Sequence, residues 1–237
     1  ALRVAADNGQ IEIVQLLIGP GANLQSTDNW GGTPLHRAAM HGQTEIIGML
    51  IDLGADMNAI NNYGQTPLHS AASNGHIGTV KVLINAGIDL NAIDHNGRSA
   101  LQLAVTKGHT EITEILCNDK NDQIIKRTRL KLATRNSEAD QYLVNRRTIF
   151  NMNNEERKCT ALHEAVWNGE VNALRVLVNA GSNLNATDLY GRTPLHKAAL
   201  YGHTETLKEL IKGGATLNAT DEKERTPLHE AAFHGHT

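Results

Sequence analysis

The sequence predicts an all-α solenoid built from helix-turn-helix units, and three observations carry this prediction. A Thr-Pro-Leu-His tetrad recurs at a fixed spacing, the same from Thr33 to Thr66 as from Thr193 to Thr226. Apolar residues after it follow helical spacing, and glycines fall at fixed places after each expected helix. A fixed period of this length is the signature of stacked repeats. Only 3% of the 237 residues are aromatic, so the expected core consists of Leu, Ile, Val and Ala.

The tetrad marks the start of the first helix of each unit. Thr is a favourable N-cap, and Pro suits the next position, where the helix needs no backbone donor. An Ala pair such as Ala38-Ala39 follows and lets neighbouring helices approach closely, and a glycine such as Gly42 ends the helix. Full or weakened tetrads begin at Thr33, Thr66, Ser99, Thr160, Thr193 and Thr226.

A second helix and a polar turn complete each unit. The second helix is predicted from apolar spacing such as that of Ile46, Ile47 and Leu50, and a second glycine, here Gly54, closes it. A polar turn such as residues 91–97 then leads to the next tetrad. Every unit is therefore expected to consist of two antiparallel helices and one turn.

This unit resembles the ankyrin repeat. The resemblance rests on the Thr-Pro-Leu-His tetrad, the Ala pair, the Gly75-His76 dipeptide before the second helix and the turn at 54–59, and it covers nearly the whole chain. It implies an ankyrin-repeat solenoid of helix-turn-helix units with projecting hairpin-like turns. It also implies a domain that binds other proteins through an extended groove.

The expected organisation is a single ankyrin array over residues 1–237. The interval between Ser99 and Thr160 is nearly twice the ordinary one and is interpreted as two short repeats; the alternative is one repeat with an insertion. A stacking irregularity is expected near residues 117–128. The expected repeats are 1–32, 33–65, 66–98, 99–127 (shortened), 128–159 (degenerate), 160–192, 193–225 and 226–237 (truncated).

Composition narrows the class of protein. The chain has 22 Lys and Arg residues against 25 Asp and Glu residues, a balance that argues against a dedicated nucleic-acid binder. No apolar run is long enough to span a membrane. Two cysteines favour a reducing, intracellular compartment, either cytoplasm or nucleus. Because the chain starts within one expected helix and stops before another, we expect a fragment of a larger protein.

No catalytic, metal or cofactor site is predicted. Most of the 12 histidines fall at two repeat positions, and the resemblance implies that they bond to backbone groups in adjacent turns. Zinc would need three or four converging ligands, and no such spacing is present. No phosphate-binding glycine loop is present either. Cys117 and Cys159 are expected to be a buried helix residue and a turn residue.

The aromatic residues provide the candidate partner-binding site. The resemblance implies two partner-facing positions per repeat, the turn tip and the end of the first helix. Trp and Tyr dominate protein–protein hot spots; the alternative is that turn-tip rings shield their neighbours. We expect a protein or peptide to dock in the concave groove of the second half, at Trp167, Leu200, Tyr201, Phe233, Tyr190 and Arg192. The first half offers a second candidate, at Trp30, Met40 and Tyr63.

The favoured function is a non-enzymatic protein–protein interaction scaffold. One alternative is the targeting or substrate-recruiting ankyrin domain of a multidomain enzyme. Another is a sensor that holds a small anionic ligand at Lys126, Arg127 or Arg129. The same basic cluster is also compatible with a nuclear-localisation signal, a patch for an acidic partner or a solvated helix face.

Two turn asparagines, Asn58 and Asn91, are candidates for hydroxylation. Each follows an acid by two residues, in Asp-Met-Asn and Asp-Leu-Asn. This context resembles that used by the asparaginyl hydroxylase that modifies ankyrin-repeat proteins. A turn-stabilising side-chain hydrogen bond is the alternative explanation for these asparagines.

Overall fold

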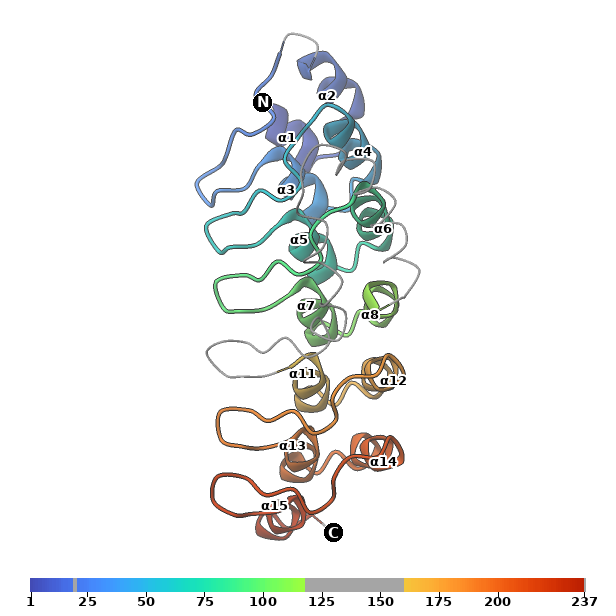
Figure 1. Ribbon diagram of the computed structural model, residues 1–237. Coiled ribbons are helices and arrows are strands. Elements are labelled where there is room, and N and C mark those ends of the chain that lie inside the picture. Colours follow the sequence, from blue (N-terminus) through green and yellow to red (C-terminus); the bar gives the residue numbers. More distant parts are fainter. Residues whose placement is uncertain (19–20, 118–159, 237) are drawn as a thin grey trace, which may run out of the picture. The chain divides into compact units, whose positions relative to one another are not determined.

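The computed structural model describes residues 1–18, 21–117 and 160–236 (Figure 1). These residues contain thirteen α-helices and no β-strand, as the sequence predicted. They form two compact units. The described part of unit 1 runs from Ala1 to His95, and that of unit 2 comprises 96–117 and 160–236. The degenerate repeat expected at 128–159 lies outside the described residues.

Unit 1 consists of three helix pairs in two layers. The first helices of successive pairs pack on one another, as do the second helices. The turns between pairs project to one side, on the left in Figure 1. The helices are α1 (Leu2–Asp7), α2 (Ile11–Ile18), α3 (Pro34–Met40), α4 (Thr44–Asp52), α5 (Pro67–Ser73) and α6 (Ile77–Ala86).

Unit 2 repeats the same two-layer arrangement. Its helices are α7 (Ala100–Thr106), α8 (Thr110–Cys117), α11 (Ala161–Trp167), α12 (Val171–Asn179), α13 (Pro194–Tyr201), α14 (Thr204–Lys212) and α15 (Pro227–Phe233). Helix α7 packs against α11, and α8 packs against α12. The repeat that begins at Ser99 is therefore followed directly in the stack by the repeat that begins at Thr160.

The tetrads form capping boxes, which explains why they recur. In the first one, the Thr33 hydroxyl accepts from the backbone N–H of His36, and His36 Nδ1 accepts from the backbone N–H of Thr33 at 3.3 Å. Two otherwise unpaired donors at the helix start are thereby satisfied. The weakened tetrad keeps this geometry with an amide, because Ser99 N–H donates to Gln102 Oε1 at 2.9 Å.

The glycine that ends the first helix of one repeat contacts the histidine of the Gly-His dipeptide in the next repeat. Gly42 has a φ of +71°, and a Cβ there would lie 2.6 Å from the His76 ring. The His76 Nε2 in turn lies 2.8 Å from the carbonyl oxygen of Met40. The glycine is thus required both for its left-handed backbone and for the close approach of the next repeat.

The core contains aliphatic side chains, as expected. Ala38 and Ala39 are fully buried between α3 and its neighbours, and Leu35, Leu50 and Leu162 are inaccessible to solvent. Burial of each such leucine stabilises the fold by about 1.5–3 kcal/mol. The aromatic residues of the described chain take no part in this layer, since each is at least 39% exposed: Trp30, Tyr63, Trp167, Tyr190, Tyr201 and Phe233.

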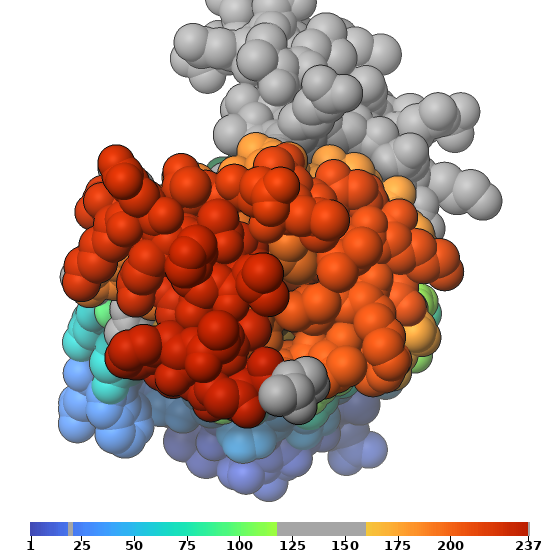
Figure 2. Space-filling view, turned by 90° about the horizontal axis from the view of Figure 1, so that it is seen from below, coloured from blue at the N-terminus to red at the C-terminus, as the bar shows by residue number. Residues whose placement is uncertain are grey.

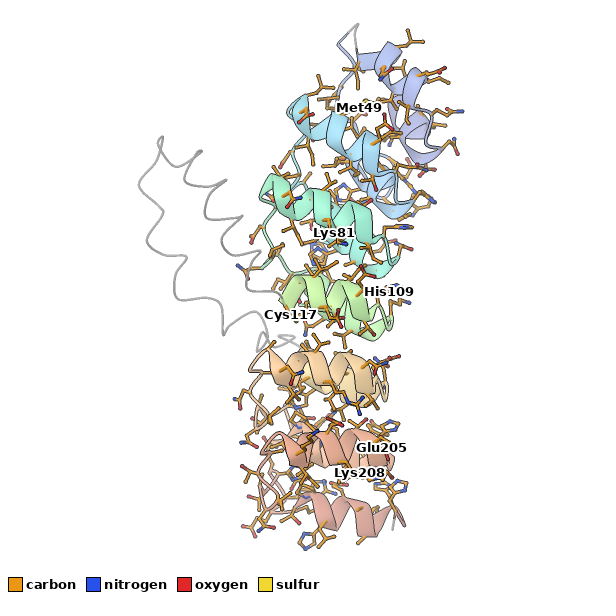
Figure 3. The ribbon with its side chains drawn as sticks, turned by 90° about the vertical axis from the view of Figure 1, so that its right-hand side faces the viewer. Met49, Lys81, His109, Cys117, Glu205 and Lys208 are labelled. Carbon is orange, nitrogen blue, oxygen red and sulfur yellow. The ribbon has the colours of Figure 1, made fainter. Side chains whose placement is uncertain are left out.

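Two parts of the surface are the outer side of the second helices and the outer face of α15, the last described helix. The second helices carry charged residues outward, such as the Glu205–Lys208 pair of α14, whose charged atoms lie 2.7 Å apart (Figure 3). Helix α15 forms the outermost red surface in Figure 2. In the described chain no helix packs on its outer face, so Leu228 is 77% exposed, whereas the equivalent Leu195 is buried.

Candidate functional site

An Asx turn positions the aromatic residue at each turn tip. In unit 1, Asp28 Oδ1 accepts from the backbone N–H groups of Trp30 and Gly32, both at 2.8 Å. Asn61 Oδ1 likewise accepts from Tyr63 N–H at 2.9 Å and from Gln65 N–H at 3.0 Å. A single side-chain oxygen therefore fixes the turn backbone.

Backbone hydrogen bonds join neighbouring turn tips. Asn62 N–H donates to the Trp30 carbonyl at 2.9 Å, and His95 N–H donates to the Tyr63 carbonyl at 2.9 Å. In unit 2, Glu222 N–H donates to the Tyr190 carbonyl at 3.1 Å. Because these bonds use the backbone of the aromatic residues, their side chains remain free to contact a partner.

The tetrad histidines are structural. His163 Nδ1 accepts from the backbone of Thr160, so its Nε2 carries the proton and donates to the Arg192 carbonyl at 3.1 Å. Burial lowers the pKa of His163 to about 4, and the Lys197 charge acts in the same direction. The neutral ring therefore links two repeats, which confirms the backbone bonding expected for this position. Within the described residues no three potential ligands converge on a metal position.

In unit 2 the predicted aromatic residues of α11 and α13 lie together. The rings of Trp167 and Tyr201 are 5.5 Å apart between centroids, at an angle of 47°. Lys197 Nζ lies 5.1 Å from the centre of the Trp167 ring, within the range of a cation–π interaction. Trp167 is nevertheless 48% exposed and Tyr201 39% exposed. The pair is thus both ordered by neighbours and accessible.

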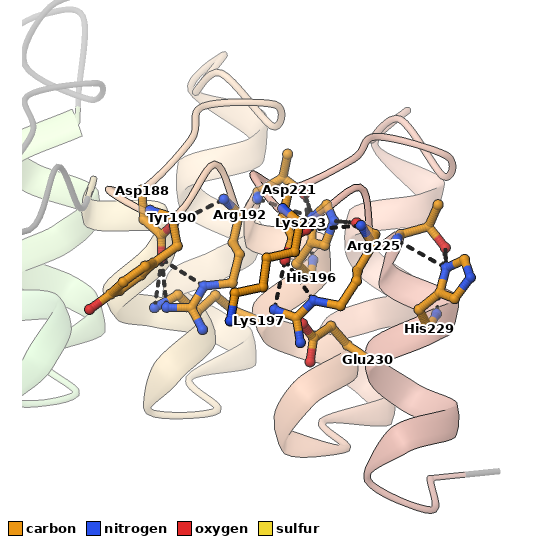
Figure 4. A network of polar contacts seen from close by, with 12 residues as sticks. Asp188, Tyr190, Arg192, His196, Lys197, Asp221, Lys223, Arg225, His229 and Glu230 are labelled. Atoms are coloured by element: carbon orange, nitrogen blue, oxygen red, sulfur yellow. Dashed lines mark hydrogen bonds and ion pairs between the residues drawn. The ribbon is translucent and has the colours of Figure 1, made fainter.

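A buried ion pair supports this aromatic pair (Figure 4). Asp188 Oδ2 lies 3.1 Å from Lys197 Nζ and 3.0 Å from Arg192 Nη2. Burial acts to raise the pKa of Asp188, but hydrogen bonds from the Arg192 backbone and the Lys197 ammonium outweigh it and lower the pKa. Arg192 also covers the Tyr190 ring at 4.6 Å.

The next turn of unit 2 has a similar network of ion pairs. Here two acids contact one base, whereas two bases contact the single acid Asp188. Arg225 Nη2 lies 2.7 Å from Asp221 Oδ2 and 2.9 Å from Glu230 Oε1 (Figure 4). Sequence reasoning had named Arg192 but missed Asp188 and Lys197. A signal was present, because an acid precedes a base at the same spacing in both Asp28/Arg37 and Asp188/Lys197.

In unit 1 the predicted residues Trp30, Met40 and Tyr63 line one groove of about 280 Å³. Trp30 is 57% exposed and Tyr63 56% exposed. Arg37 Nε donates to Asp28 Oδ2 at 2.7 Å, and its guanidinium lies 5.2 Å from the Trp30 ring centre. The complete lining is Asp28, Trp30, Gly32, His36, Arg37, Met40, Asn61, Tyr63, Gln65 and Ser70.

The remaining predicted contact residues lie at the margin of the unit 2 surface. Leu200 is half-buried in α13. Phe233 is 80% exposed and lies 5.1 Å from the His234 ring, on the helix with the uncovered outer face. Its exposure therefore follows in part from its place at the end of the described stack.

Two of the turn asparagines, Asn58 and Asn185, make the expected side-chain hydrogen bonds. Asn58 Oδ1 accepts from the backbone N–H of Asp89 in the next repeat at 3.0 Å. Asn185 Oδ1 accepts from Thr216 N–H in the same way at 2.9 Å. Asn91 differs, because its backbone N–H donates to Asp89 Oδ1 while its own side-chain oxygen has no hydrogen-bond partner among the described residues. Hydroxylation of Asn58 or Asn91 stays a prediction.

Other sequence predictions concern reactive and charged groups. Cys117 is buried at the end of α8, and burial raises the pKa of its thiol to about 12. A thiol of this kind is unreactive at neutral pH.

None of the described helices combines the length and apolar character needed to cross a membrane. Cys159 and the basic residues Lys126, Arg127 and Arg129 lie outside the described residues.

Comparison with known proteins identifies the kind of repeat. The family model described as ankyrin repeats (3 copies) matches residues 2–94, 54–127, 118–188 and 181–237. A search of curated proteins found no match. Ankyrin repeats are generally protein–protein interaction domains, and the family is typically non-catalytic.

Solved structures show the same fold. The ankyrin repeat domain of Bcl-3, described as a unique member of the IkappaB protein family, is 23% identical, with a TM-score of 0.73 over 97% of this chain and 92% of that chain. The human ASB11 ankyrin repeat domain is 24% identical, with a TM-score of 0.71 over 98% and 91%. An ankyrin repeat domain (ABAYE2397) from Acinetobacter baumannii AYE is 27% identical, with a TM-score of 0.71 over 91% and 98%.

Proposed function

Because the chain belongs to the ankyrin repeat family, we propose that it is a non-enzymatic scaffold that binds another protein or a peptide. The partner docks in the concave groove of unit 2, over Trp167, Leu200, Tyr201 and Phe233, with Tyr190 and Arg192 at the turn edge. The observation that carries the proposal is the Trp167–Tyr201 pair, whose rings lie 5.5 Å apart while both remain accessible.

Preorganisation is the physical argument for this surface. Lys197 holds the Trp167 ring, and Asp188 holds Lys197 at 3.1 Å. A side chain that is already ordered loses little conformational entropy on binding. Truncation of a buried Trp or Tyr at an interface costs about 2 kcal/mol or more. Two such rings in contact therefore suffice to decide whether a complex forms.

The test compares variants in a pull-down. Trp167→Ala combined with Tyr201→Ala should abolish capture of proteins that the unaltered chain retains from its source cells. The matched control is Ile211→Ala, because Ile211 is a 43% exposed residue of α14, on the second-helix layer. This control should retain the same proteins.

Thermal unfolding separates binding from folding. The double variant should melt within about 3 °C of the unaltered chain, the shift for under roughly 1 kcal/mol in a chain of this size. A large drop in melting temperature would show that the rings belong to the core. Unchanged capture with unchanged stability would exclude unit 2 and leave the unit 1 residues Trp30, Met40 and Tyr63 as the docking surface.

A further inference from the structure

The groove in unit 1 lies where one repeat lacks the charged pair of the preceding repeat. The Asp28–Arg37 pair occupies the space between turn and helix in the preceding repeat. At the equivalent positions of the next repeat stand Asn61 and Ser70. Both line the groove. A serine in place of a long basic side chain leaves the space open.

Hydrogen bonding fixes the orientation of Asn61. Its Oδ1 accepts from two backbone N–H groups, at 2.9 Å and 3.0 Å, so the other terminal atom is the amide nitrogen. Within residues 1–18 and 21–117 neither this nitrogen nor the Ser70 hydroxyl has a hydrogen-bond partner. The groove therefore offers two donors that no described group of unit 1 uses.

The lining carries no net charge. Arg37 and Asp28 neutralise each other. His36 is neutral, since burial lowers the pKa of its ring. The other lining residues are uncharged side chains or glycine. A charged group entering this groove loses water without gaining a counter-charge, which is unfavourable.

The uncharged lining and the two donors favour an uncharged side chain that carries an acceptor. A charged side chain is disfavoured by desolvation, and an apolar one leaves the Asn61 amide and the Ser70 hydroxyl unpaired. We propose that the groove receives the uncharged carboxamide side chain of a glutamine or asparagine of a partner polypeptide. The carboxamide oxygen accepts from Asn61 Nδ2, and the flat amide lies between Trp30 and Tyr63. This inference rests on the proposed function, because it names a feature of the partner.

The size of the groove agrees with this occupant. Small-molecule sites occupy roughly 300–1,000 Å³, whereas this groove occupies about 280 Å³. It therefore has room for one side chain of a longer polypeptide. The remainder of that polypeptide contacts the exposed faces of Trp30 and Tyr63.

The test uses small probes on the full chain. N-acetylglutamine methylamide is titrated while NMR follows the Trp30 indole N–H and the Asn61 side-chain amide. We expect saturable shifts in the millimolar range, as for a single side chain. N-acetylglutamate and N-acetylleucine methylamides should bind at least about tenfold more weakly, because the two terminal amides are common to all three probes and their side chains offer the wrong charge or no acceptor.

A double variant closes the groove while keeping the fold. Asn61→Asp with Ser70→Arg restores the pair that Asp28 and Arg37 already form in the preceding repeat. This variant should have the same melting temperature as the unaltered chain and should no longer bind the glutamine probe. If it fails to fold, Tyr63→Ala provides the second variant, because its 56% exposed ring removes one wall without disturbing the core.

Three results would overturn the inference: no saturable shift with the glutamine probe, equal binding of the glutamate or leucine probe, or unchanged probe binding to a folded double variant. Failure of the proposed function looks different, because the unaltered chain would then capture no protein that depends on Trp167 and Tyr201. Probe binding is measured without any partner, so failure of this inference can be told apart from failure of the proposed function.

Discussion

Two turns can be compared, one that begins at Asn61 in unit 1 and one that begins at Asp188 in unit 2. They have the same pattern of backbone hydrogen bonds but differ in the charge of the first side chain. Each uses one side-chain oxygen to accept two backbone N–H groups, at 2.9–3.0 Å. The second terminal atom differs. In Asp188 it binds Lys197 and Arg192, whereas in Asn61 it faces an open groove. The surface chemistry of the repeats thus differs at the terminal side-chain atom that does not bond to the turn backbone.

The difference also has an energetic side. Lys197 has a side chain that is only 4% exposed, and its partner Asp188 is 2% exposed. A buried ion pair contributes little relative to apolar residues, but removal of one partner leaves a costly buried charge. Removal of Asn61 or Ser70 in unit 1 leaves no buried charge without a partner, because both side chains are uncharged.

The largest expected effect comes from Asp188→Ala. It removes the counter-charge of Lys197 and two backbone acceptor bonds, so we expect a loss of about 3–5 kcal/mol in the free energy of unfolding. Asn61→Ala removes the same two backbone bonds without exposing a buried charge, and about 1–2 kcal/mol is expected. Urea denaturation measures both. Equal losses in the two alanine variants would contradict the comparison. Asp188→Asn keeps the hydrogen bonds of the turn, so its loss measures the contribution of the negative charge alone.

The next effect is a loss of stability in acid through His163. Its pKa is about 4 in the folded chain and about 6.5 when unfolded. The unfolded chain therefore binds the proton first, and the free energy of unfolding falls as pH drops from about 6.5 to 4, by roughly 3 kcal/mol in total. Denaturation curves across this range measure the slope. His163→Gln, which copies the Ser99–Gln102 capping box, should make the slope shallower, and His36, whose pKa burial also lowers, contributes to the slope that remains. An unchanged slope would contradict the assignment.

A smaller effect should be the same in both units. Asn58 and Asn185 each accept one backbone N–H from the following repeat, at 3.0 Å and 2.9 Å. Asn58→Ala and Asn185→Ala should each cost about 1 kcal/mol, the net contribution of one hydrogen bond. Hydrogen exchange of the Asp89 and Thr216 amides is the direct measurement. Faster exchange at only one of these amides would show that the two inter-repeat bonds are not equivalent.

The smallest effect concerns an exposed ion pair of unit 2. Arg175 Nη2 lies 2.9 Å from Glu209 Oε1, and the Arg175 side chain is 52% exposed. Exposed pairs of this kind contribute little because water and salt screen them. Arg175→Ala should leave the melting temperature within experimental error. A clear drop would mean that charge pairing, and not burial, distinguishes Asp188–Lys197.

The amino-acid sequence by itself determined the helices, their caps and the repeat register. These features depend on interactions between near neighbours in the chain, such as the bond between Thr33 and His36, so they are readable locally. It also indicated a core of Leu, Ile, Val and Ala, and the aromatic residues that the structure describes lie outside that core. The cross-repeat role of the tetrad histidines followed only from the family resemblance.

Only the tertiary structure decided which surface residues act together. The contact of Trp167 with Tyr201 joins two repeats, and Lys197 reaches across to the Trp167 ring. The groove beside Trp30 depends on the size and charge of Asn61 and Ser70 in the adjoining repeat. Such contacts join side chains of successive repeats, and their geometry depends on how closely two repeats stack. The period gives the order of the repeats along the chain, but stacking alone sets the distances between their side chains.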